Sequence, residues 1–303
     1  MSLVVFGTIA LDDVKTPSGV RKDMLGGSAA HFSMSARLFS NIHLVGVVGK
    51  DFLQAHLELF KRKKINIESL RIVHGPSFHW EGEYKQEDFN TALTRATELG
   101  VLVDYVPQIT NMQRNIKNLF LANYDAEIQM KMLQLMKNPH LVGLDSMNLW
   151  IELQKKPLIK LIKKVNLFVL NDGEARMLTG ETNLIKAIKA LKRMGPQMII
   201  LKKGEHGVVF LTDQFMFSFP AYPVEKVVDP TGAGDTFAGG VMGYLSSVKK
   251  INQTTLKKAA IYATVLSSFN VESFGMSKTQ NLTLVEVNKR AKKFIKYISP
   301  PGK

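Results

Sequence analysis

The sequence contains no cysteine among its 303 residues. This absence excludes a disulfide scaffold, a thiol nucleophile, an iron–sulfur cluster and a cysteine-ligated zinc site. No apolar run approaches the roughly 20 residues that a membrane helix needs. The first residues lack the basic start of a secretory signal, and the acidic Asp12 follows them at once. These absences together predict a cytoplasmic protein, for which a reducing environment is typical.

Acidic residues are also in short supply: 26 Asp and Glu stand against 40 Lys and Arg, which gives a formal net charge of +14. The excess comes from short lysine-rich runs scattered along the chain, none of them interleaved with aromatic residues. Nucleic-acid-binding proteins gather such charge in a motif or on one face. We therefore expect the runs to lie on solvated helix faces, with no nucleic acid and no membrane as partner. The 45% of hydrophobic residues is average for globular proteins and excludes general disorder.

Strand-like and helix-like segments alternate along the chain. Short apolar runs predict strands at 3–6, 42–48, 118–122, 141–144, 166–170, 198–201 and 208–211. Apolar residues at helical spacing predict helices at 28–39, 51–64, 125–137, 182–194, 234–246, 254–269 and 283–298. Asp51 is the expected N-cap of the second helix, and Thr283 and Glu286 form a capping box that opens the last one. Because strands separated by helices form parallel sheets, this order predicts an α/β fold with a doubly wound, mainly parallel sheet and helices on both faces.

Two segments interrupt the alternation, near 14–25 and 74–108. The second contains aromatic residues that alternate with polar ones at 78–84, which is typical of a half-exposed strand. Two extended inserts in an α/β chain can form a small β-strand lid over one edge of the sheet. The alternative is a pair of ordinary surface hairpins. We expect one domain over residues 1–303 with the two inserts as its lid.

The segment 229–240 reads Asp-Pro-Thr-Gly-Ala-Gly-Asp-Thr-Phe-Ala-Gly-Gly and carries the strongest chemical signal. Gly232 and Gly234 permit backbone geometry and close approach that a side chain would block. The helix predicted after them would present free backbone N–H groups, which form an anion site. An Asp at that place repels phosphate, but it can act as the base that takes a proton from an attacking hydroxyl. For Asp235, the alternative is a carboxylate that merely complements the helix dipole.

This segment resembles the signature of the ribokinase-like (PfkB) family of carbohydrate kinases. Four more motifs similar to those of the family precede this segment, and the five together occur in the family's order along nearly the whole chain. They are Gly7-Thr8-Ile9-Ala10-Leu11-Asp12, Gly26-Gly27-Ser28-Ala29-Ala30, Leu170-Asn171-Asp172-Gly173-Glu174 and Lys202-Lys203-Gly204-Glu205-His206-Gly207. The resemblance implies a kinase that transfers the γ-phosphoryl group of ATP, with Mg²⁺, to a hydroxymethyl group.

The resemblance also assigns roles to residues of this chain. Asp235 would be the general base, and Gly232, Ala233 and Gly234 would supply the amides of the anion hole. The acceptor site would contain Asp12, Gly26, Gly27, Ser28 and His31. The nucleotide site would contain Asn171, Lys202, Gly204, Gly207 and Asn270, and Glu174 would hold Mg²⁺ through water. Asp229 and Thr231 match a monovalent-cation loop that implies K⁺, with simple turn capping as the alternative. Family analogy also suggests a homodimer that pairs through the lid.

Two departures from the family pattern bear on the acceptor. His31 stands where the family usually has Asn, and its ring can hydrogen-bond a hydroxyl or stack on a ring; the alternative is that His31 packs under the lid. Ser28 stands where the family's phosphofructokinases have Lys, which favours a non-phosphorylated acceptor.

The main prediction is therefore an ATP-dependent kinase of a small sugar or polyol. A nucleoside kinase is the alternative, and a non-catalytic sugar- or nucleotide-binding descendant is a third. No P-loop, dinucleotide fingerprint, zinc-protease or esterase motif occurs.

Overall fold

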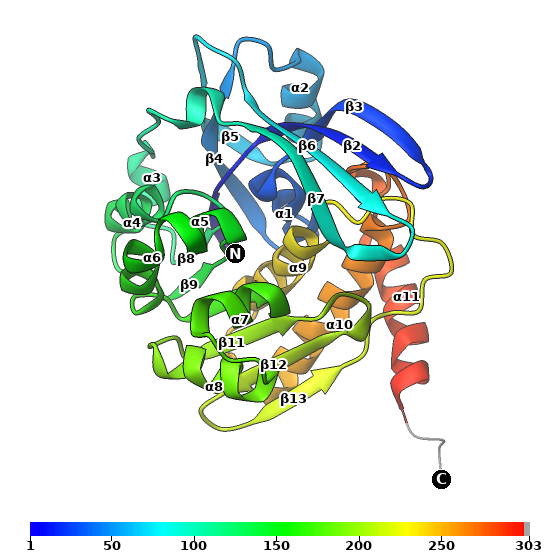
Figure 1. Ribbon diagram of the computed structural model, residues 1–303. Helices are drawn as coiled ribbons and strands as arrows, with labels where there is room; N and C mark the ends of the chain where they lie inside the picture. Colours follow the sequence, from blue (N-terminus) through cyan, green and yellow to red (C-terminus); the bar gives the residue numbers. More distant parts are fainter. Residues whose placement is uncertain (300–303) are drawn as a thin grey trace.

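The computed structural model describes residues 1–299, which contain a nine-stranded and a four-stranded sheet (Figure 1). Across the large sheet the strands lie in the order β13 (Met216–Phe219), β12 (Val208–Thr212), β11 (Met198–Lys202), β10 (Leu167–Asn171), β9 (Leu141–Leu144), β8 (Asn118–Leu121), β1 (Ser2–Phe6), β4 (Asn41–Gly49) and β5 (Asn66–Val73). The seven strands from β11 to β5 pair in parallel, and β12 and β13 add an antiparallel edge. The predicted doubly wound, mainly parallel sheet is thus confirmed.

Helices cover both faces of this sheet. They are α1 (Ser28–Ala36), α2 (Gln54–Arg62), α3 (Asn111–Arg114), α4 (Ala126–Leu135), α5 (Asn148–Leu153), α6 (Lys155–Ile162), α7 (Asp172–Thr179), α8 (Leu184–Arg193), α9 (Ala233–Ser247), α10 (Gln253–Asn270) and α11 (Leu284–Ile298). Successive residues of β1 alternate between two apolar cores, one shared with α1, α2, α9 and α10 and the other with α4, α6, α7 and α8. Side chains alternate across a strand, so a sheet buried on both faces has continuous apolar strands. In residues 1–299, no helix combines the length and hydropathy needed to cross a membrane.

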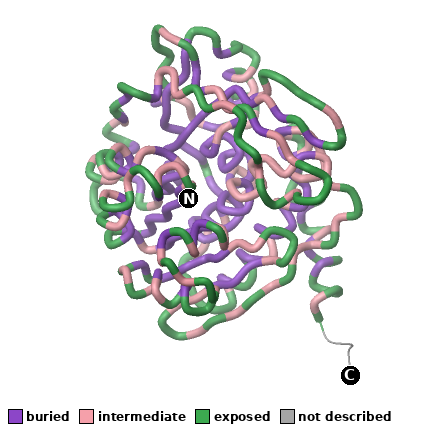
Figure 2. The backbone as a smooth tube through the Cα atoms, viewed as in Figure 1, coloured by how far each residue is buried: buried purple, intermediate pink, exposed green. Residues whose placement is uncertain are grey.

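The helix α9 is mostly buried and lies at the centre of one layer (Figure 2). It lies between α1 and α10, and its glycines allow the helices to approach closely. A Cβ atom at Gly239 would lie 2.3 Å from the Phe32 carbonyl oxygen, and one at Gly240 would lie 2.7 Å from the Ala263 Cα. Because α9 is fixed along its length, its N-terminus has a fixed position above the sheet.

The four-stranded sheet contains β3 (Gly19–Gly26), β2 (Ala10–Thr16), β6 (Phe78–Lys85) and β7 (Asp88–Glu98), in that order. It is built from the two segments that interrupt the strand–helix alternation. This sheet contacts a distant part of the chain: the Thr16 hydroxyl of β2 donates to the Val228 carbonyl at 2.8 Å. That this sheet works as a lid, within one domain, and pairs across a homodimer stays a prediction.

The structure differs from the sequence pattern in several elements. The strands β5 and β13 were not predicted, and neither were the helices α3, α5, α6 and α7. The helix α2 begins at Gln54 rather than at Asp51. The Asp51 carboxylate instead accepts the Ser77 amide at 2.9 Å and the Ser77 hydroxyl at 2.7 Å, and thereby holds the base of the second insert. The capping box of Thr283 and Glu286 on α11 is present.

Candidate active site

Three neighbouring strands end in polar side chains at one edge of the large sheet. Asp145 follows β9, Asn171 ends β10 and Lys202 ends β11, where Asn171 and Lys202 are paired in the strand register. In open α/β sheets, ligands bind outside the carboxyl ends of the strands. The N-terminus of α9 is at the same edge, because a Cβ atom at Gly234 would lie 2.9 Å from Lys202 Nζ.

The turn before α9 depends on the left-handed conformation of Gly232, which has a φ of +71° and is the N-cap of the helix. Asp235 lies in the first helical turn and is half-buried. Burial raises the pKa of Asp235, and the Lys202 ammonium partly offsets this rise. The Ala233 amide donates to the Pro230 carbonyl at 3.1 Å. The Ala233 amide therefore already has a hydrogen-bond partner within the turn. We keep the anion-hole prediction for the amides of Gly232 and Gly234.

Lys202 lies among three carboxylates. Its ammonium is 3.1 Å from Asp145 Oδ2, and the two side chains are 17% and 4% exposed. Burial alone would lower the pKa of Lys202, but Asp145, Glu174 and Asp235 raise it above its ordinary value. Burial raises the pKa of Asp145 to about 6 and that of Glu174 to about 8, and Lys202 opposes both shifts. With all groups ionised, negative charges outnumber positive ones here, so the site favours a further cation.

Asn171 and Glu174 form a reciprocal capping box at the start of α7. The Asn171 Oδ1 accepts the Glu174 amide at 2.8 Å, and Glu174 Oε2 accepts the Asn171 amide at 2.7 Å. One carboxylate oxygen of Glu174 is therefore already used as a hydrogen-bond acceptor at the start of the helix. In residues 1–299, Asp13, Asp23 and His79 of the small sheet are the only three groups whose ligand atoms could surround one ion directly. A Mg²⁺ ion near Glu174 would therefore be held through water and phosphate oxygens, as Mg²⁺ usually is. The excess negative charge of the site fits such an ion.

His31 occupies a different place from the one expected. It is 2% exposed, and a Cβ atom at Gly232 would lie 2.3 Å from its ring, so the imidazole packs beneath the turn before α9. Its Nδ1 is 3.2 Å from Asn270 Oδ1. Burial lowers the pKa of His31, which favours the neutral ring. His31 thus packs beneath the glycine turn rather than beneath the lid, and its contact with an acceptor stays a prediction.

Asn270 likewise supports the turn. It is fully buried at the end of α10, its amide donates to the Thr231 carbonyl at 2.7 Å, and its Oδ1 accepts the Thr236 hydroxyl at 3.0 Å. These bonds use the amide nitrogen and the oxygen inside the protein. A contact of Asn270 with the nucleotide stays a prediction.

The glycine pair before α1 lies against Asp12. A Cβ atom at Gly26 would be 1.8 Å from the Asp12 carboxylate, and one at Gly27 would be 2.6 Å from the Thr8 carbonyl. Burial raises the pKa of Asp12 to about 8, and the Gly27 amide, which donates to it, opposes this rise. The Ser28 hydroxyl is 3.0 Å from Thr8 Oγ1 and donates to the Asn123 carbonyl at 3.2 Å. Asp12 therefore remains the candidate contact for an acceptor, whereas Ser28 ties the turn to the end of β8.

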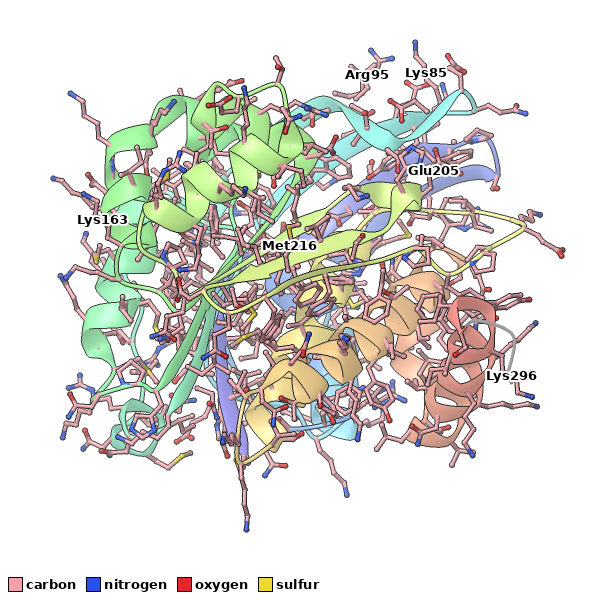
Figure 3. The ribbon with its side chains drawn as sticks, turned by 90° about the horizontal axis from the view of Figure 1, so that it is seen from below. Lys85, Arg95, Lys163, Glu205, Met216 and Lys296 are labelled. Atoms are coloured by element: carbon pink, nitrogen blue, oxygen red, sulfur yellow. The ribbon has the colours of Figure 1, made fainter. Side chains whose placement is uncertain are left out.

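The glycine turn after β11 is in contact with the small sheet. Asn90, between Asp88 and Glu98 on β7, accepts the Glu205 amide at 3.3 Å, and a Cβ atom at Gly204 would be 1.9 Å from its side-chain oxygen. Figure 3 shows Glu205 on this turn close to the strands that carry Lys85 and Arg95. Gly207 has a φ of +84° and closes the turn. The turn predicted on the nucleotide side thus lies directly beside the small sheet.

Asp229 and Thr231 form the turn that precedes Gly232 and Gly234. The two oxygens of the fully buried Asp229 accept the Thr231 and Gly275 amides, each at 2.8 Å. The Thr231 hydroxyl is 3.5 Å from the hydroxyl of Tyr84 on β6. These contacts are those of the turn-capping alternative. A monovalent cation at this loop stays a prediction.

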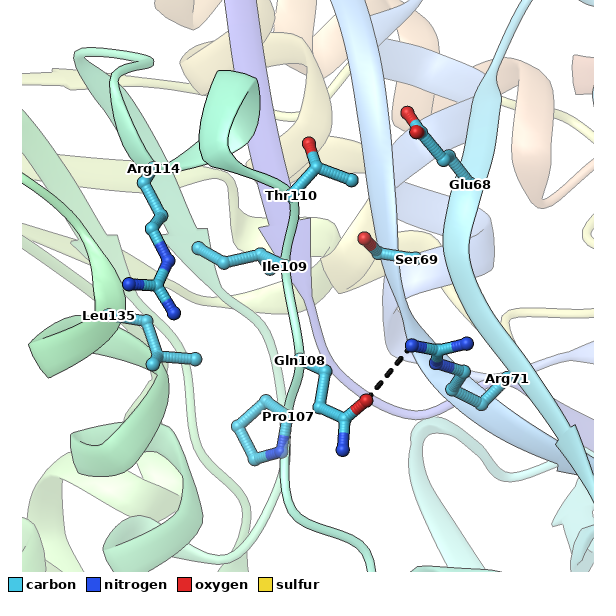
Figure 4. A pocket seen from close by; sticks show the side chains of 9 residues that line it. All are labelled: Glu68, Ser69, Arg71, Pro107, Gln108, Ile109, Thr110, Arg114 and Leu135. Carbon is cyan, nitrogen blue, oxygen red and sulfur yellow. Dashed lines mark hydrogen bonds between the residues drawn. The ribbon is translucent and has the colours of Figure 1, made fainter.

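Sequence analysis missed Asp145, Tyr84 and Asn90. For Asp145 a signal was present, since it directly follows a predicted strand and neighbours the strands that end in Asn171 and Lys202. For Tyr84 and Asn90 there was none, because only the folded insert brings them to the turns at 231 and 204. A separate hollow of about 360 Å³, in which Arg71 of β5 donates to Gln108 at 2.9 Å, has no residue of these motifs (Figure 4).

Comparison with known proteins decides the family. A profile described as pfkB family carbohydrate kinase matches residues 3–282. The chain belongs to this family. PfkB proteins are sugar and nucleoside kinases that use ATP with Mg²⁺, so the chain is a phosphotransferase.

The relatives of this PfkB kinase include two nucleoside kinases. It is 30% identical to a cytidine kinase of Thermococcus kodakarensis over 253 residues, which cover 80% of this chain and 88% of that protein. It is 26% identical to a nucleoside kinase of Methanocaldococcus jannaschii over 252 residues, which cover 82% and 80%. A structure of a nucleoside kinase from Burkholderia thailandensis in complex with inosine has a TM-score of 0.76, covers 98% and 99% of the two chains and is 19% identical, which supports the fold alone.

Proposed function

We propose that this PfkB protein is an ATP-dependent nucleoside kinase, which was the alternative in the sequence analysis, rather than a kinase of a small sugar or polyol. The reaction type rests on one arrangement: Asp235 lies in the first turn of α9, after the left-handed Gly232, and beside Lys202 at the carboxyl edge of the sheet. A carboxylate at a helix N-terminus that offers amides to phosphate is suited to accept the proton of an attacking hydroxyl.

In the proposed reaction, Asp235 takes the proton from a primary hydroxyl of the acceptor. The hydroxyl oxygen forms the new bond to the γ-phosphorus, and the bond between that phosphorus and the bridging oxygen of ADP breaks. The amides of Gly232 and Gly234 and the Lys202 ammonium receive the negative charge of the phosphoryl group. Mg²⁺, held through water near Glu174, would neutralise phosphate charge when bound. Asp12 would orient the acceptor through its other hydroxyls.

The nucleoside as acceptor rests on the relatives and on one feature of the acceptor side. The cytidine and nucleoside kinases named above each align with about four fifths of this chain, at 80% and 82%. Trp150 of α5 is half-buried and donates from its indole nitrogen to Asn123 Oδ1 at 2.9 Å, and Asn123 also binds Ser28 through its carbonyl. A flat aromatic surface tied to the acceptor turn is suited to a planar base. A bare sugar would not use it.

The test is ADP release with ATP and Mg²⁺ over a panel of cytidine, uridine, adenosine, inosine and guanosine, together with ribose, fructose and glycerol. We expect at least one nucleoside to give a higher kcat/KM than every sugar or polyol, with the Asp235→Asn protein as the blank for contaminating kinases. A sugar or polyol that exceeds all nucleosides would restore the original prediction of a sugar kinase. If no compound of the panel led to ADP release although the protein still bound ATP, the non-catalytic descendant would be favoured.

A further inference from the structure

Asp145 is absent from the five motifs that carry the family resemblance, yet it makes the closest polar contact to Lys202. It is 3% exposed, and its Oδ2 is 3.1 Å from the Lys202 ammonium. Buried carboxylates are rare unless they are paired, because desolvation disfavours their charge. Its partner is the ammonium that lies against Gly234 at the start of α9.

The two members of this pair differ in how firmly they are held. The Asp145 amide donates to the Leu121 carbonyl at 2.8 Å, and its carbonyl accepts from the fully buried Gln129 at 3.1 Å. Its Oδ1 accepts the Ser146 amide at 2.8 Å, which leaves Oδ2 for Lys202. Lys202 has a long side chain with four rotatable carbons, and no other hydrogen bond of its ammonium is recorded among residues 1–299. The carboxylate therefore fixes the place of the ammonium, and not the reverse.

The ammonium lies beside the partly positive N-terminus of α9, and the carboxylates of Asp145, Glu174 and Asp235 offset this repulsion. A phosphoryl group bound at this point would contact both the ammonium and the free amides of α9.

On the basis of the proposed function, we propose that Asp145 is a positioning residue that holds the Lys202 ammonium beside the N-terminus of α9, where it binds the γ-phosphoryl group of ATP. Asp145 does not touch the nucleotide itself. Its effect passes through Lys202 and concerns the γ-phosphate, which ATP has and ADP lacks. The consequence is a preference for ATP over ADP that depends on Asp145.

The first test is calorimetric titration of ATP and of ADP, each with Mg²⁺ and without acceptor, into wild-type and Asp145→Asn protein. A charged hydrogen bond to phosphate is worth roughly 10- to 100-fold in affinity, so we expect the ATP Kd to rise by about 10-fold and the ADP Kd to change by less than about twofold. Equal weakening of both nucleotides would overturn the proposal. So would an unchanged ATP Kd together with a raised Mg²⁺ requirement, which would make Asp145 a metal-site residue. Because no acceptor is present, failure of the nucleoside assignment would not affect this result.

The second test uses the Lys202→Met background, which also serves if Asp145→Asn alone fails to fold. If Asp145 acts through Lys202, then Lys202→Met and the double variant Asp145→Asn/Lys202→Met bind ATP equally and turn over equally. A further loss of about 10-fold in the double variant would show an action of Asp145 that bypasses Lys202 and would refute the proposal.

The matched control is Asp213→Asn, which breaks another Asp–Lys pair, with Lys192. The strand register places Thr212, next to Asp213, opposite Met198 at the amino end of β11, whereas Lys202 is at its carboxyl end. This variant should leave the ATP Kd, the ADP Kd and the turnover unchanged. Loss of ATP affinity in the control would mean that ion pairs affect binding through general stability, which would remove the support for Asp145.

Discussion

The substitution Gly232→Ala tests whether the turn before α9 is shaped by steric contact with His31. The new Cβ would lie 2.3 Å from the Cγ and Nδ1 of the His31 ring, and the residue has a φ of +71°. The left-handed conformation costs an alanine roughly 1–2 kcal/mol, and insertion of a methyl group into a packed core costs about 1–3 kcal/mol more. We therefore expect the free energy of unfolding to fall by about 2–5 kcal/mol.

Denaturant unfolding of purified protein, followed by fluorescence and circular dichroism, measures this loss. Gly234→Ala is the matched control in the same motif, because Gly234 has helical backbone angles and its Cβ would meet only the end of the Lys202 side chain, at 2.9 Å, rather than a packed ring. Its unfolding free energy should stay within about 1 kcal/mol of wild type. Turnover of Gly232→Ala should fall by about 100-fold, since a shift of about 1 Å at the reacting groups has that effect.

The double variant His31→Ala/Gly232→Ala separates the two contributions. With the ring removed, only the conformational cost of the left-handed alanine remains, so Gly232→Ala should cost at least about 1 kcal/mol less in the His31→Ala background. The reasoning is refuted if Gly232→Ala unfolds at the same denaturant concentration as wild type. It is also refuted if the substitution costs the same in both backgrounds, because His31 would then not shape the turn.

Four further predictions concern single residues of the site. Asp235→Asn should lower turnover by about 10²–10⁴-fold in the coupled assay and leave ATP binding nearly unchanged, and near-native turnover would exclude it as the base. Glu174→Gln preserves the capping box but removes the negative charge that Glu174 carries above its pKa of about 8, so the Mg²⁺ concentration for half activity, measured above pH 8, should rise. An unchanged titration would leave Glu174 as a helix cap alone. His31→Ala should lower the melting temperature and leave the acceptor KM unchanged, whereas a raised KM with native stability would return His31 to the acceptor site. Burial raises the pKa of Asp12 to about 8, and acceptor hydroxyls donate best to its ionised form. The acceptor affinity, measured without nucleotide, should therefore rise as the pH increases through about 8. An affinity that does not change with pH would contradict an acceptor contact by Asp12.

The order of elements and the chemical motifs were readable from local pattern. Short apolar runs fixed β1, β8, β9, β10 and β11, because a strand buried on both faces needs apolar residues throughout. The capping box at Thr283 and the glycine turn at Gly232 were readable because each depends on residues within a few positions. The strands β5 and β13 lie at the sheet edges and carry exposed residues, so their pattern is weak.

What the sequence alone determined is therefore the class of the fold and the family, since these depend on composition, periodicity and short motifs, and from them it predicted the residues of phosphoryl transfer. Only the tertiary structure decided what those residues touch. It placed His31 and Asn270, which are 239 residues apart, together beneath the glycine turn, and it placed Asp145 after β9 against Lys202 of β11, with β10 between the two strands. Such contacts form between distant segments when helices and strands pack, and no local pattern specifies which buried polar groups then meet.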